Sequence, residues 1–291
     1  MNILVVGAAG FLGKELCRDF ASLGKVTAAD KYEGVPGLHF LDLARKELIH
    51  ETFARLKPEL VLLTAAISWV DFCETNRDQA WLVNTEGPKE VARACKKYSS
   101  FLVFYSSDYV FDGASGPYDE EARPHPINVY GSSKLEAEKA VCAELSRYLI
   151  IRTCGIYGYE KGGKNYAMQV SESLRDKKPV QAVNDQYGTP VYVDDLSRAS
   201  LELINGKKCG LYNIVGPDYL NRVCFAEEIA DVFGFDKGLI SPIATETLRQ
   251  PAPRPRKGGL KADKLIAELN FRQRSLREGL LAMKAKIAAD C

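Results

Sequence analysis

Histidine is scarce in this sequence, and its cysteines lack the spacing of a metal site. The 291 residues include three histidines, His39, His50 and His125, which lie far apart, and eight cysteines without a CxxC pair. A protein zinc site usually takes Cys or His ligands paired at short, regular spacing. We therefore expect no metal site. We also expect the cysteines, several of which lie in apolar runs, to stay reduced in a cytoplasmic protein.

The sequence also lacks a long apolar run and an excess of either charge. Its longest apolar-looking stretch, LVLLTAAISWV at residues 60–70, is too short to span a bilayer, and no signal peptide is visible. The 39 Lys and Arg residues nearly balance the 38 Asp and Glu residues, which leaves a net charge of +1. Such a surface has no long-range field to attract nucleic acid or an anionic membrane, so we expect neither as a partner.

Short, wholly apolar runs alternate with amphipathic stretches along the first half of the chain. The runs have the length of strands, and none alternates polar with apolar residues, which is typical of parallel strands covered on both faces. They are Ile3–Val6, Val26–Ala29, Leu60–Leu63, Phe101–Tyr105 and Tyr148–Ile151. After the first run, Leu12, Leu16 and Phe20 form the apolar stripe of a helix. This order predicts an α/β fold with a doubly wound, Rossmann-like parallel sheet.

The alternation of apolar runs with amphipathic stretches becomes less regular after residue 153, where we expect a smaller substrate-binding lobe. Glycine and lysine gather in GYEKGGKN at residues 158–165, which predicts a loop. QPAPRPRKGG at residues 250–259 is rich in proline and arginine, so we expect it to be irregular and exposed. Apolar residues from Leu276 to Ile287 predict a final amphipathic helix.

Two elements in the second half indicate that the chain returns to the sheet. A helix is predicted over Val193–Ile204, and a strand-like run follows at Leu211–Val215. We therefore divide the chain into a nucleotide-binding domain at residues 1–153, to which residues 190–215 return, and a substrate lobe at residues 154–291.

A glycine-rich segment, GAAGFLG, lies between the first predicted strand and the helix that follows it. Gly7 permits a tight turn, Gly10 lets the backbone approach a pyrophosphate, and Gly13 lets the helix pack closely on the sheet. The helix start at Phe11 and Leu12 offers free N–H groups and the positive end of the helix dipole to phosphates. A glycine-rich turn without a ligand is the alternative, but the position between strand and helix favours a dinucleotide site.

An acidic residue follows the second predicted strand. Asp30 lies 17 residues after Gly13, where a carboxylate can accept hydrogen bonds from both ribose hydroxyls of NAD. It repels the 2′-phosphate of NADP, although the neighbouring Lys31 offsets that repulsion, so both NADH and NADPH remain candidates. Other candidates for contact with the cofactor follow later strands: Asp42, Leu43, Ala65 and Ala66.

Tyr130 and Lys134 occupy positions i and i+4 of a predicted helix and so share one face. A free tyrosine has a pKa of about 10, and a nearby ammonium lowers it, so that the phenol exchanges protons with a carbonyl or alcohol oxygen. Ser107 ends the strand run at the edge where such sheets bind ligands, and its hydroxyl is placed to polarise a carbonyl. A turn cap is the alternative for Ser107. Together with the glycine segment, the three residues indicate a catalytic set.

These segments resemble the extended short-chain dehydrogenases, and within them the dTDP-4-dehydrorhamnose reductase family. The resemblance covers nearly the whole chain and rests on GAAGFLG, SSDYVFDG, NVYGSSKLEAE, IRTCGIYG, NDQYGTPVYVDDL and RPRKGGLKADKL. It implies reduction of a 4-keto nucleotide sugar by NADPH or NADH. It also places Ser107 at the catalytic Ser/Thr position, Tyr130 as the acid and Lys134 as its partner; both of these also contact the cofactor.

The residues after Ser107 separate reactions within this superfamily. Dehydratases place Asp-Glu there, whereas this chain has Asp108 followed by Tyr109, so the resemblance favours simple reduction. An epimerase remains open. The reductases often have tryptophan where this chain has Gly155. The candidates to stack on the base in its place are Tyr157, Tyr159 and Tyr187, and ordinary packing is the alternative for each. The predicted substrate contacts are Ser68, Asp108, Tyr109, Asn165, Tyr187 and Arg254, of which Arg254 matches the family's Arg-Pro position and is placed to bind a diphosphate.

A second resemblance points to a different class of function. SSDYVFDG and the RPR segment are similar to the regulatory beta subunit of methionine adenosyltransferase. The alternative is therefore a dinucleotide-binding protein that regulates a partner enzyme without catalysis. A homodimer also remains open. Some relatives suggest a metal-bridged dimer through Glu15, but a single helical carboxylate is usually solvated, so we expect no metal.

Overall fold

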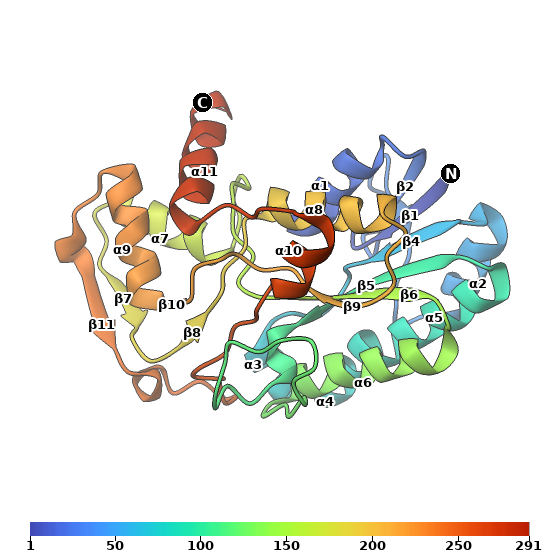
Figure 1. The fold of residues 1–291 in the computed structure, drawn as a ribbon, viewed down its shortest axis with the longest axis horizontal. Helices are drawn as coiled ribbons and strands as arrows, with labels where there is room; N and C mark the ends of the chain where they lie inside the picture. The colour runs from blue at the N-terminus through green and yellow to red at the C-terminus, as the bar shows by residue number, and fades with distance from the viewer. Residues whose placement is uncertain (291) are drawn as a thin grey trace.

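The computed structural model describes residues 1–290, and a parallel sheet of seven strands lies at its centre (Figure 1). The strand order is β3-β2-β1-β4-β5-β6-β9, and every neighbouring pair is parallel. The bounds are β1 Asn2–Val6, β2 Lys25–Asp30, β3 His39–Phe40, β4 Leu60–Leu63, β5 Phe101–Ser107, β6 Tyr148–Thr153 and β9 Gly210–Asn213. The prediction of a doubly wound parallel sheet is confirmed. The order reverses between β1 and β4, and folds of this type bind ligands beyond the carboxyl ends of such strands.

The central strands are buried on both faces because their side chains alternate between two apolar cores. In β1, Ile3 and Val5 belong to one core, whereas Leu4 and Val6 belong to the other. All four residues of β4 are buried. This explains why the strands read as unbroken apolar runs in the sequence.

Helices cover each face of the sheet (Figure 1). One core contains residues from α1, α8 and α10, and the other contains residues from α2, α5 and α6. The bounds are α1 Phe11–Phe20, α2 Lys46–Leu56, α3 Val70–Thr75, α4 Arg77–Trp81, η1 Leu82–Glu86, α5 Gly87–Tyr98, η2 Asp108–Val110, α6 Val129–Glu144, α8 Val193–Asn205 and α10 Asp263–Leu269.

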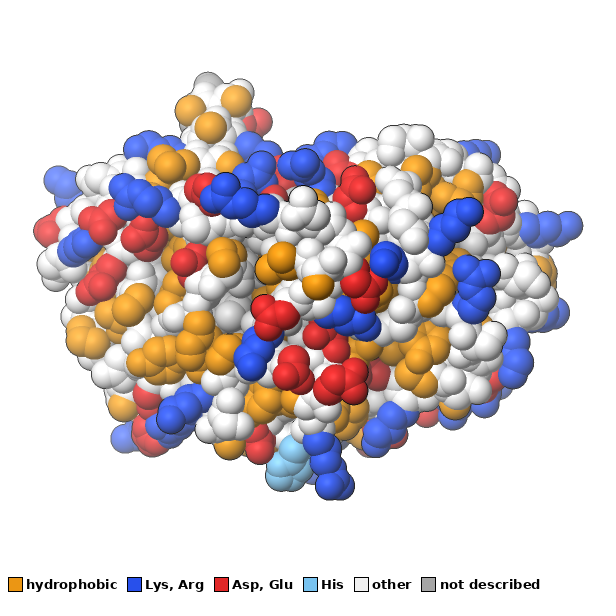
Figure 2. Space-filling view, viewed as in Figure 1, with side chains coloured by type: hydrophobic (Ala, Val, Ile, Leu, Met, Phe, Trp, Pro, Cys, Tyr) orange, Lys and Arg blue, Asp and Glu red, His pale blue; other side chains and the backbone are white. Residues whose placement is uncertain are grey.

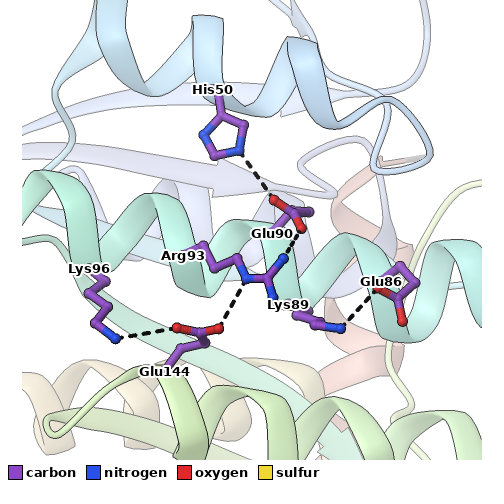
Figure 3. Close-up of polar contacts among 7 residues, drawn as sticks. All are labelled: His50, Glu86, Lys89, Glu90, Arg93, Lys96 and Glu144. Carbon is purple, nitrogen blue, oxygen red and sulfur yellow. Dashed lines mark hydrogen bonds and ion pairs between the residues drawn. The ribbon is translucent and has the colours of Figure 1, made fainter.

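Charged side chains link α2, α5 and α6, the three helices that cover one face of the sheet (Figure 3). His50 of α2 lies 3.2 Å from Glu90 of α5, and Arg93 of α5 also pairs with Glu90 at 2.6 Å. Arg93 reaches on to Glu144, at the end of α6, with a nitrogen–oxygen distance of 3.0 Å. These exposed pairs each contribute little to stability, but together they span the layer that carries Tyr130.

The second half of the chain forms a smaller lobe at the left of Figure 1. It contains a short antiparallel ribbon of β8 and β10, a parallel pair of β7 and β11, and three helices around a separate apolar core. The bounds are α7 Tyr166–Arg175, β7 Val180–Val183, β8 Tyr187–Gly188, β10 Leu220–Asn221, α9 Arg222–Phe233, η3 Lys237–Leu239, β11 Ile240–Ile243, η4 Thr245–Leu248 and α11 Leu276–Asp290. The chain returns to the sheet at β9, which pairs with β6, and again at α10.

Residues 250–259 are irregular as predicted, but the prediction that they are exposed is wrong for much of the segment. Ala252 is 2% exposed, and Pro255, Gly258 and Gly259 are also buried. The reason is a close backbone pairing with residues 113–118, in which the Lys257 N–H donates to Gly113 and the Gly116 N–H donates to Lys257. Composition alone does not reveal such a partner segment.

The structure shows no membrane-crossing helix, metal cluster or disulfide within residues 1–290. None of their helices is both long and apolar enough to cross a membrane, and they contain no group of three or more His, Cys, Asp or Glu arranged to hold a metal ion. The seven cysteines from Cys17 to Cys224 are free thiols. Cys291 lies outside the described residues.

Candidate active site

The three glycines of the GAAGFLG segment meet different surroundings. Gly7 has a φ of +92°, and a Cβ there would lie 2.5 Å from Thr64 Oγ1. A Cβ on Gly13 would overlap the Gly7 carbonyl oxygen. Gly10 is exposed, and the nearest atom to a Cβ on it is the Gly7 oxygen at 3.2 Å. The fold therefore requires glycine at 7 and 13, whereas at 10 it leaves a bare Cα open to an approaching ligand.

Helix α1 begins at this open position. Gly10 is its N-cap and supplies no side-chain hydrogen bond to the first turn. The backbone N–H groups at the start of a helix have no partner within the helix, so those of Phe11 and Leu12 suit a phosphate. Leu12 is itself 8% exposed and packs in the core, which limits it to a backbone contact. The segment fits the pyrophosphate of a dinucleotide.

The Asp30 carboxylate lies at the carboxyl end of β2, directly against the glycine segment. One oxygen accepts a hydrogen bond from Ala9 N–H at 3.0 Å, and the other accepts from Lys31 N–H at 2.8 Å. Each carboxylate oxygen still has acceptor capacity for a ribose hydroxyl. The Lys31 side chain is exposed beside it. Asp30, which favours NAD, and Lys31, which favours NADP, thus lie side by side, so the structure leaves both cofactors as candidates.

The other predicted cofactor contacts lie after β3 and β4. Asp42 accepts a hydrogen bond from Ala44 N–H at 2.9 Å, which caps its own turn. Leu43 is buried against Gly87, so only its backbone remains for an adenine contact. Ala65 and Ala66 are half-buried, and Ala65 N–H donates to Val6 O at 3.0 Å. Ala65 therefore lies beside the turn at Gly7.

Ser107 and Tyr130 meet where β5 ends and α6 begins. The Ser107 hydroxyl accepts from Tyr109 N–H at 3.2 Å, so the capping role is present, and it donates to Asp108 Oδ1 at 3.2 Å. Tyr130 is fixed in the first turn of α6, whose N-cap, Asn128, accepts from Gly131 N–H at 2.8 Å. Burial raises the pKa of Tyr130 and Asp108 adds to this rise, whereas the Ser107 hydroxyl counters it.

Lys134 is buried at 2% exposure and points to the backbone of β5. Its ammonium donates to Tyr105 O at 2.6 Å and lies 4.1 Å from the centre of the Phe104 ring. Burial lowers the pKa of Lys134 to about 7, and the charge of Glu138 opposes that shift. Burial is the largest cause of the raised pKa of Tyr130, and the Lys134 ammonium is turned towards a carbonyl group of β5. The expectation that this lysine lowers the pKa of Tyr130 stays a prediction.

A pocket that is partly open to solvent lies beside the catalytic set. The predicted substrate residues Asp108, Tyr109 and Tyr187 line it together. Tyr109 packs edge-on against Tyr130, with ring centres 5.7 Å apart, so the pocket adjoins the proposed acid. Burial raises the pKa of Asp108. Residues that the sequence analysis missed complete the wall: Cys154, Gln186, Gly188, Pro190, Leu220, Asn221, Arg222, Phe225, Pro255 and Gly258. Six of these lie within segments that carry the family resemblance but had no predicted role: Cys154, Gln186, Gly188, Pro190, Pro255 and Gly258. The other four belong to no motif, so no sequence pattern indicated them.

Two predicted substrate residues have partners within the protein. Arg254 pairs with Asp71 at 2.8 Å and donates to Ala252 O at 3.0 Å, with only 9% of its side chain exposed. Asn165 is the N-cap of α7: its oxygen accepts from Met168 N–H at 3.2 Å, and its nitrogen donates to Gly158 O at 3.0 Å. Neither lines the pocket, and any substrate contact by them stays a prediction.

Ser68 and the candidate base-stacking tyrosines lie in different settings. Ser68 is exposed in the segment after β4. Tyr157 is 1% exposed and packs against Tyr192 and Phe225 in the lobe core, so it does not face a ligand. The Tyr159 hydroxyl donates to an Asp290 oxygen at 2.5 Å. Of the three tyrosines, Tyr187 is the one that lines the pocket.

The loop at residues 158–165 contacts the segments that follow β1 and β4. Glu160 pairs with Lys14 of α1 at 2.8 Å. The Lys164 ammonium lies 5.5 Å from the centre of the Trp69 ring, in the segment after β4. This loop therefore connects the lobe to the two segments between which a dinucleotide would pass.

Comparison with known proteins agrees with this geometry. A family model described as RmlD substrate binding domain matches residues 1–288. The spore coat polysaccharide biosynthesis protein SpsK of Bacillus subtilis is 31% identical over 292 residues, which cover 100% of this chain and 99% of the relative. The dTDP-4-dehydrorhamnose reductase of Salmonella typhimurium is 30% identical over 281 residues, covering 93% of this chain and 92% of the relative.

Solved structures give the same result. The dTDP-4-dehydrorhamnose reductase of Bacillus anthracis, in complex with NADP, has a TM-score of 0.91 at 28% identity, covering 98% of this chain and 99% of that one. The corresponding protein of Clostridium acetobutylicum has a TM-score of 0.90 at 30% identity, covering 99% and 100%. A UDP-glucose 4-epimerase of Thermus thermophilus, at 22% identity and a TM-score of 0.87, shares the fold alone. The chain belongs to the RmlD substrate binding domain family.

Proposed function

We propose that this protein is an NAD(P)H-dependent oxidoreductase that reduces the 4-keto group of a nucleotide-activated deoxysugar, as a dTDP-4-dehydrorhamnose reductase does. The observation that carries the proposal is the meeting of Ser107 and Tyr130 beside a pocket, at the carboxyl edge of a sheet whose glycine segment suits a dinucleotide. The relatives named as reductases, which match nearly the full chain, support it.

Each catalytic residue has a task set by its surroundings. A bound NADPH or NADH supplies the hydride. Tyr130, whose pKa is raised by burial, is a neutral phenol that donates its proton to the alkoxide oxygen formed from the keto group. The Ser107 hydroxyl, at the end of β5, holds that oxygen in line and stabilises its developing charge. Lys134 brings a buried amine within the same helix face and supports the phenolate left behind.

The lobe supplies the substrate side of the site. We infer that residues 154–291, apart from the returning residues 190–215, bind the nucleotide sugar, while residues 1–153 bind the cofactor. The helix at 263–269, which packs on the sheet, is a further return. Ser68, Asp108 and Tyr109 contribute to the same pocket from the sheet side in this proposal.

We also propose that the protein is cytoplasmic and forms a homodimer. Free thiols agree with a reducing, cytoplasmic location. Light scattering on the purified protein measures the assembly directly.

The decisive experiment measures loss of reduced-nicotinamide absorbance with NADPH and NADH, each with a dTDP-4-keto-6-deoxy sugar. Sugar-dependent oxidation supports the reductase, and the faster of the two cofactors resolves the opposition between Asp30 and Lys31. Tyr130→Phe is the matched variant: it should bind cofactor normally and lose nearly all turnover. Full turnover in that variant would overturn the assignment of the acid. Tight cofactor binding with no oxidation of any keto sugar would favour the non-catalytic regulator instead.

A further inference from the structure

One arginine of the pocket has no acidic partner. Arg222, the first residue of α9, lines the pocket, and its guanidinium lies 4.7 Å from the centre of the Tyr166 ring. Within residues 1–290 no carboxylate forms a hydrogen bond or ion pair with that guanidinium. A planar cation that rests on an aromatic face keeps its N–H groups free for a bidentate anion such as a phosphate.

The positive charge of Arg222 affects the pKa values of two residues that line the pocket, Asp108 and Tyr109. Burial raises the pKa of Asp108, and Arg222 is among the groups that oppose that rise. Burial raises the pKa of Tyr109 to about 12, and Arg254 and, to a lesser extent, Arg222 act to lower it. The guanidinium is therefore close enough to the inner wall to attract an anion next to the reacting sugar.

The other arginine considered for a diphosphate is already neutralised. Arg254 forms its ion pair with Asp71 at 2.8 Å. A phosphate at Arg254 would have to displace that carboxylate or lie against it, and both arrangements cost free energy. Arg222 carries no such cost.

Tyr187, which lines the same pocket, forms an exposed aromatic surface with Tyr219. Tyr187 of β8 and Tyr219, just before β10, are 37% and 38% exposed, and their ring centres lie 5.5 Å apart. Pairing of Tyr187 with Asn221 places the residue before Arg222 directly opposite this tyrosine. Figure 2 shows hydrophobic side chains gathered over the part of the lobe that holds β8 and β10. Exposed aromatic rings beside a polar pocket suit a stacked base.

The wall near these tyrosines has little side-chain bulk. A Cβ on Gly155 would meet only Pro190, at 3.4 Å, so this position leaves room for a ligand. Gly188 is packed against Cys154, whose sulfur would lie 2.9 Å from a Cβ there. Exposure also increases from Asp108, at 5%, to Tyr187, at 37%. The pocket wall thus includes the buried Asp108, the half-buried Arg222 and the exposed Tyr187.

We propose that Arg222 binds the diphosphate of the nucleotide substrate and that Tyr187 and Tyr219 stack on its base, which directs the sugar to Tyr130. This assignment rests on the proposed function for the identity of the sugar, but its binding site is testable without catalysis. It gives the diphosphate to Arg222, whereas the sequence had suggested Arg254.

Isothermal titration calorimetry with dTDP, UDP, GDP and thymidine tests the site. Arg222→Gln should weaken binding of the preferred nucleoside diphosphate by roughly 10- to 100-fold, as expected for loss of hydrogen bonds to a charged group, and leave thymidine binding unchanged. Arg222→Lys should recover part of the affinity. Arg277→Gln removes a guanidinium that pairs with Glu228 on the surface of the lobe, and it is the matched control.

The aromatic surface is tested in the same titrations. Tyr187→Ala should weaken dTDP and thymidine alike, by roughly tenfold if one stacked ring is lost, whereas Tyr187→Phe should stay near the wild type. The affinity for NADPH reports whether each variant remains folded. The proposal fails if the wild type binds no nucleoside diphosphate, if Arg222→Gln binds it normally, or if only Arg254→Gln loses affinity. Keto-sugar-dependent NADPH oxidation decides the reductase function separately, whichever result the titrations give.

Discussion

Lys134 makes the stability of the free protein depend on pH. Burial lowers its pKa from 10.5 in the unfolded chain to about 7 in the folded chain. Between these values the unfolded state holds more protons, so the free energy of unfolding rises with pH. From about pH 7 to about pH 9 this rise amounts to at most about 2 kcal/mol, which Lys134→Met should remove. Urea unfolding of both proteins at the two pH values measures it; equal slopes with pH would contradict the burial of a titrating lysine.

Adding a side chain at Gly10 should impair cofactor binding, whereas adding one at Gly13 should impair folding. A Cβ on Gly13 overlaps the Gly7 carbonyl, whereas a Cβ on Gly10 projects from an exposed position. Gly10→Val should therefore abolish tight NADPH binding and lower the free energy of unfolding by only about 1 kcal/mol, as a poorer N-cap. Gly13→Val should prevent normal folding. Fluorescence titration with NADPH and urea unfolding measure the two effects, and normal cofactor affinity in Gly10→Val would rule out a pyrophosphate at this turn.

At the scale of elements, a buried ion pair joins helix α6 to strand β6. Arg152 and Glu138 have side chains that are 4% and 6% exposed, and two hydrogen bonds of 2.9 and 2.6 Å connect them. Glu138→Gln leaves the guanidinium uncompensated and should lower the free energy of unfolding by about 3–5 kcal/mol. On the same helix, Glu136 forms an exposed pair with Lys139, so Glu136→Gln should cost less than about 0.5 kcal/mol. Urea unfolding compares them, and similar losses would show that burial is not decisive here.

The sequence predicts elements well where local chemistry determines them. Strand β4 is wholly apolar because both of its faces are buried, and the turn after β1 needs glycine because its φ is positive. Contacts between segments that are far apart in the chain produce no comparable local pattern in the sequence. The Asp71 partner of Arg254 lies far away in the sequence, and the backbone pairing that buries residues 250–259 has no compositional sign. Arg222 carries no motif at all, because its position in the pocket depends on the β8–β10 ribbon.

At the scale of the whole molecule, the last third of the chain serves both halves. Strand β9 and helix α10 complete the sheet side, while α9 and α11 enclose the lobe core. Between α10 and α11, Arg274 N–H donates to Asp195 at 2.8 Å, at the start of α8. The two halves are thus tied by several chain crossings and not by one linker, which favours a pocket whose two walls keep a fixed spacing.

Such crossings predict that the two cores unfold together. Leu265 of α10 is fully buried on the sheet side, and Leu280 of α11 is fully buried in the lobe. Leu265→Ala and Leu280→Ala should each lower the free energy of unfolding by about 2–5 kcal/mol, since each removes a buried leucine from a packed core. If the protein is one cooperative unit, both variants shift a single urea transition, followed by circular dichroism and by retention of bound NADPH. If instead Leu280→Ala unfolds the lobe while NADPH stays bound, the lobe is an independent domain, and the substrate pocket between the halves depends on a weaker interface than the shared segments imply.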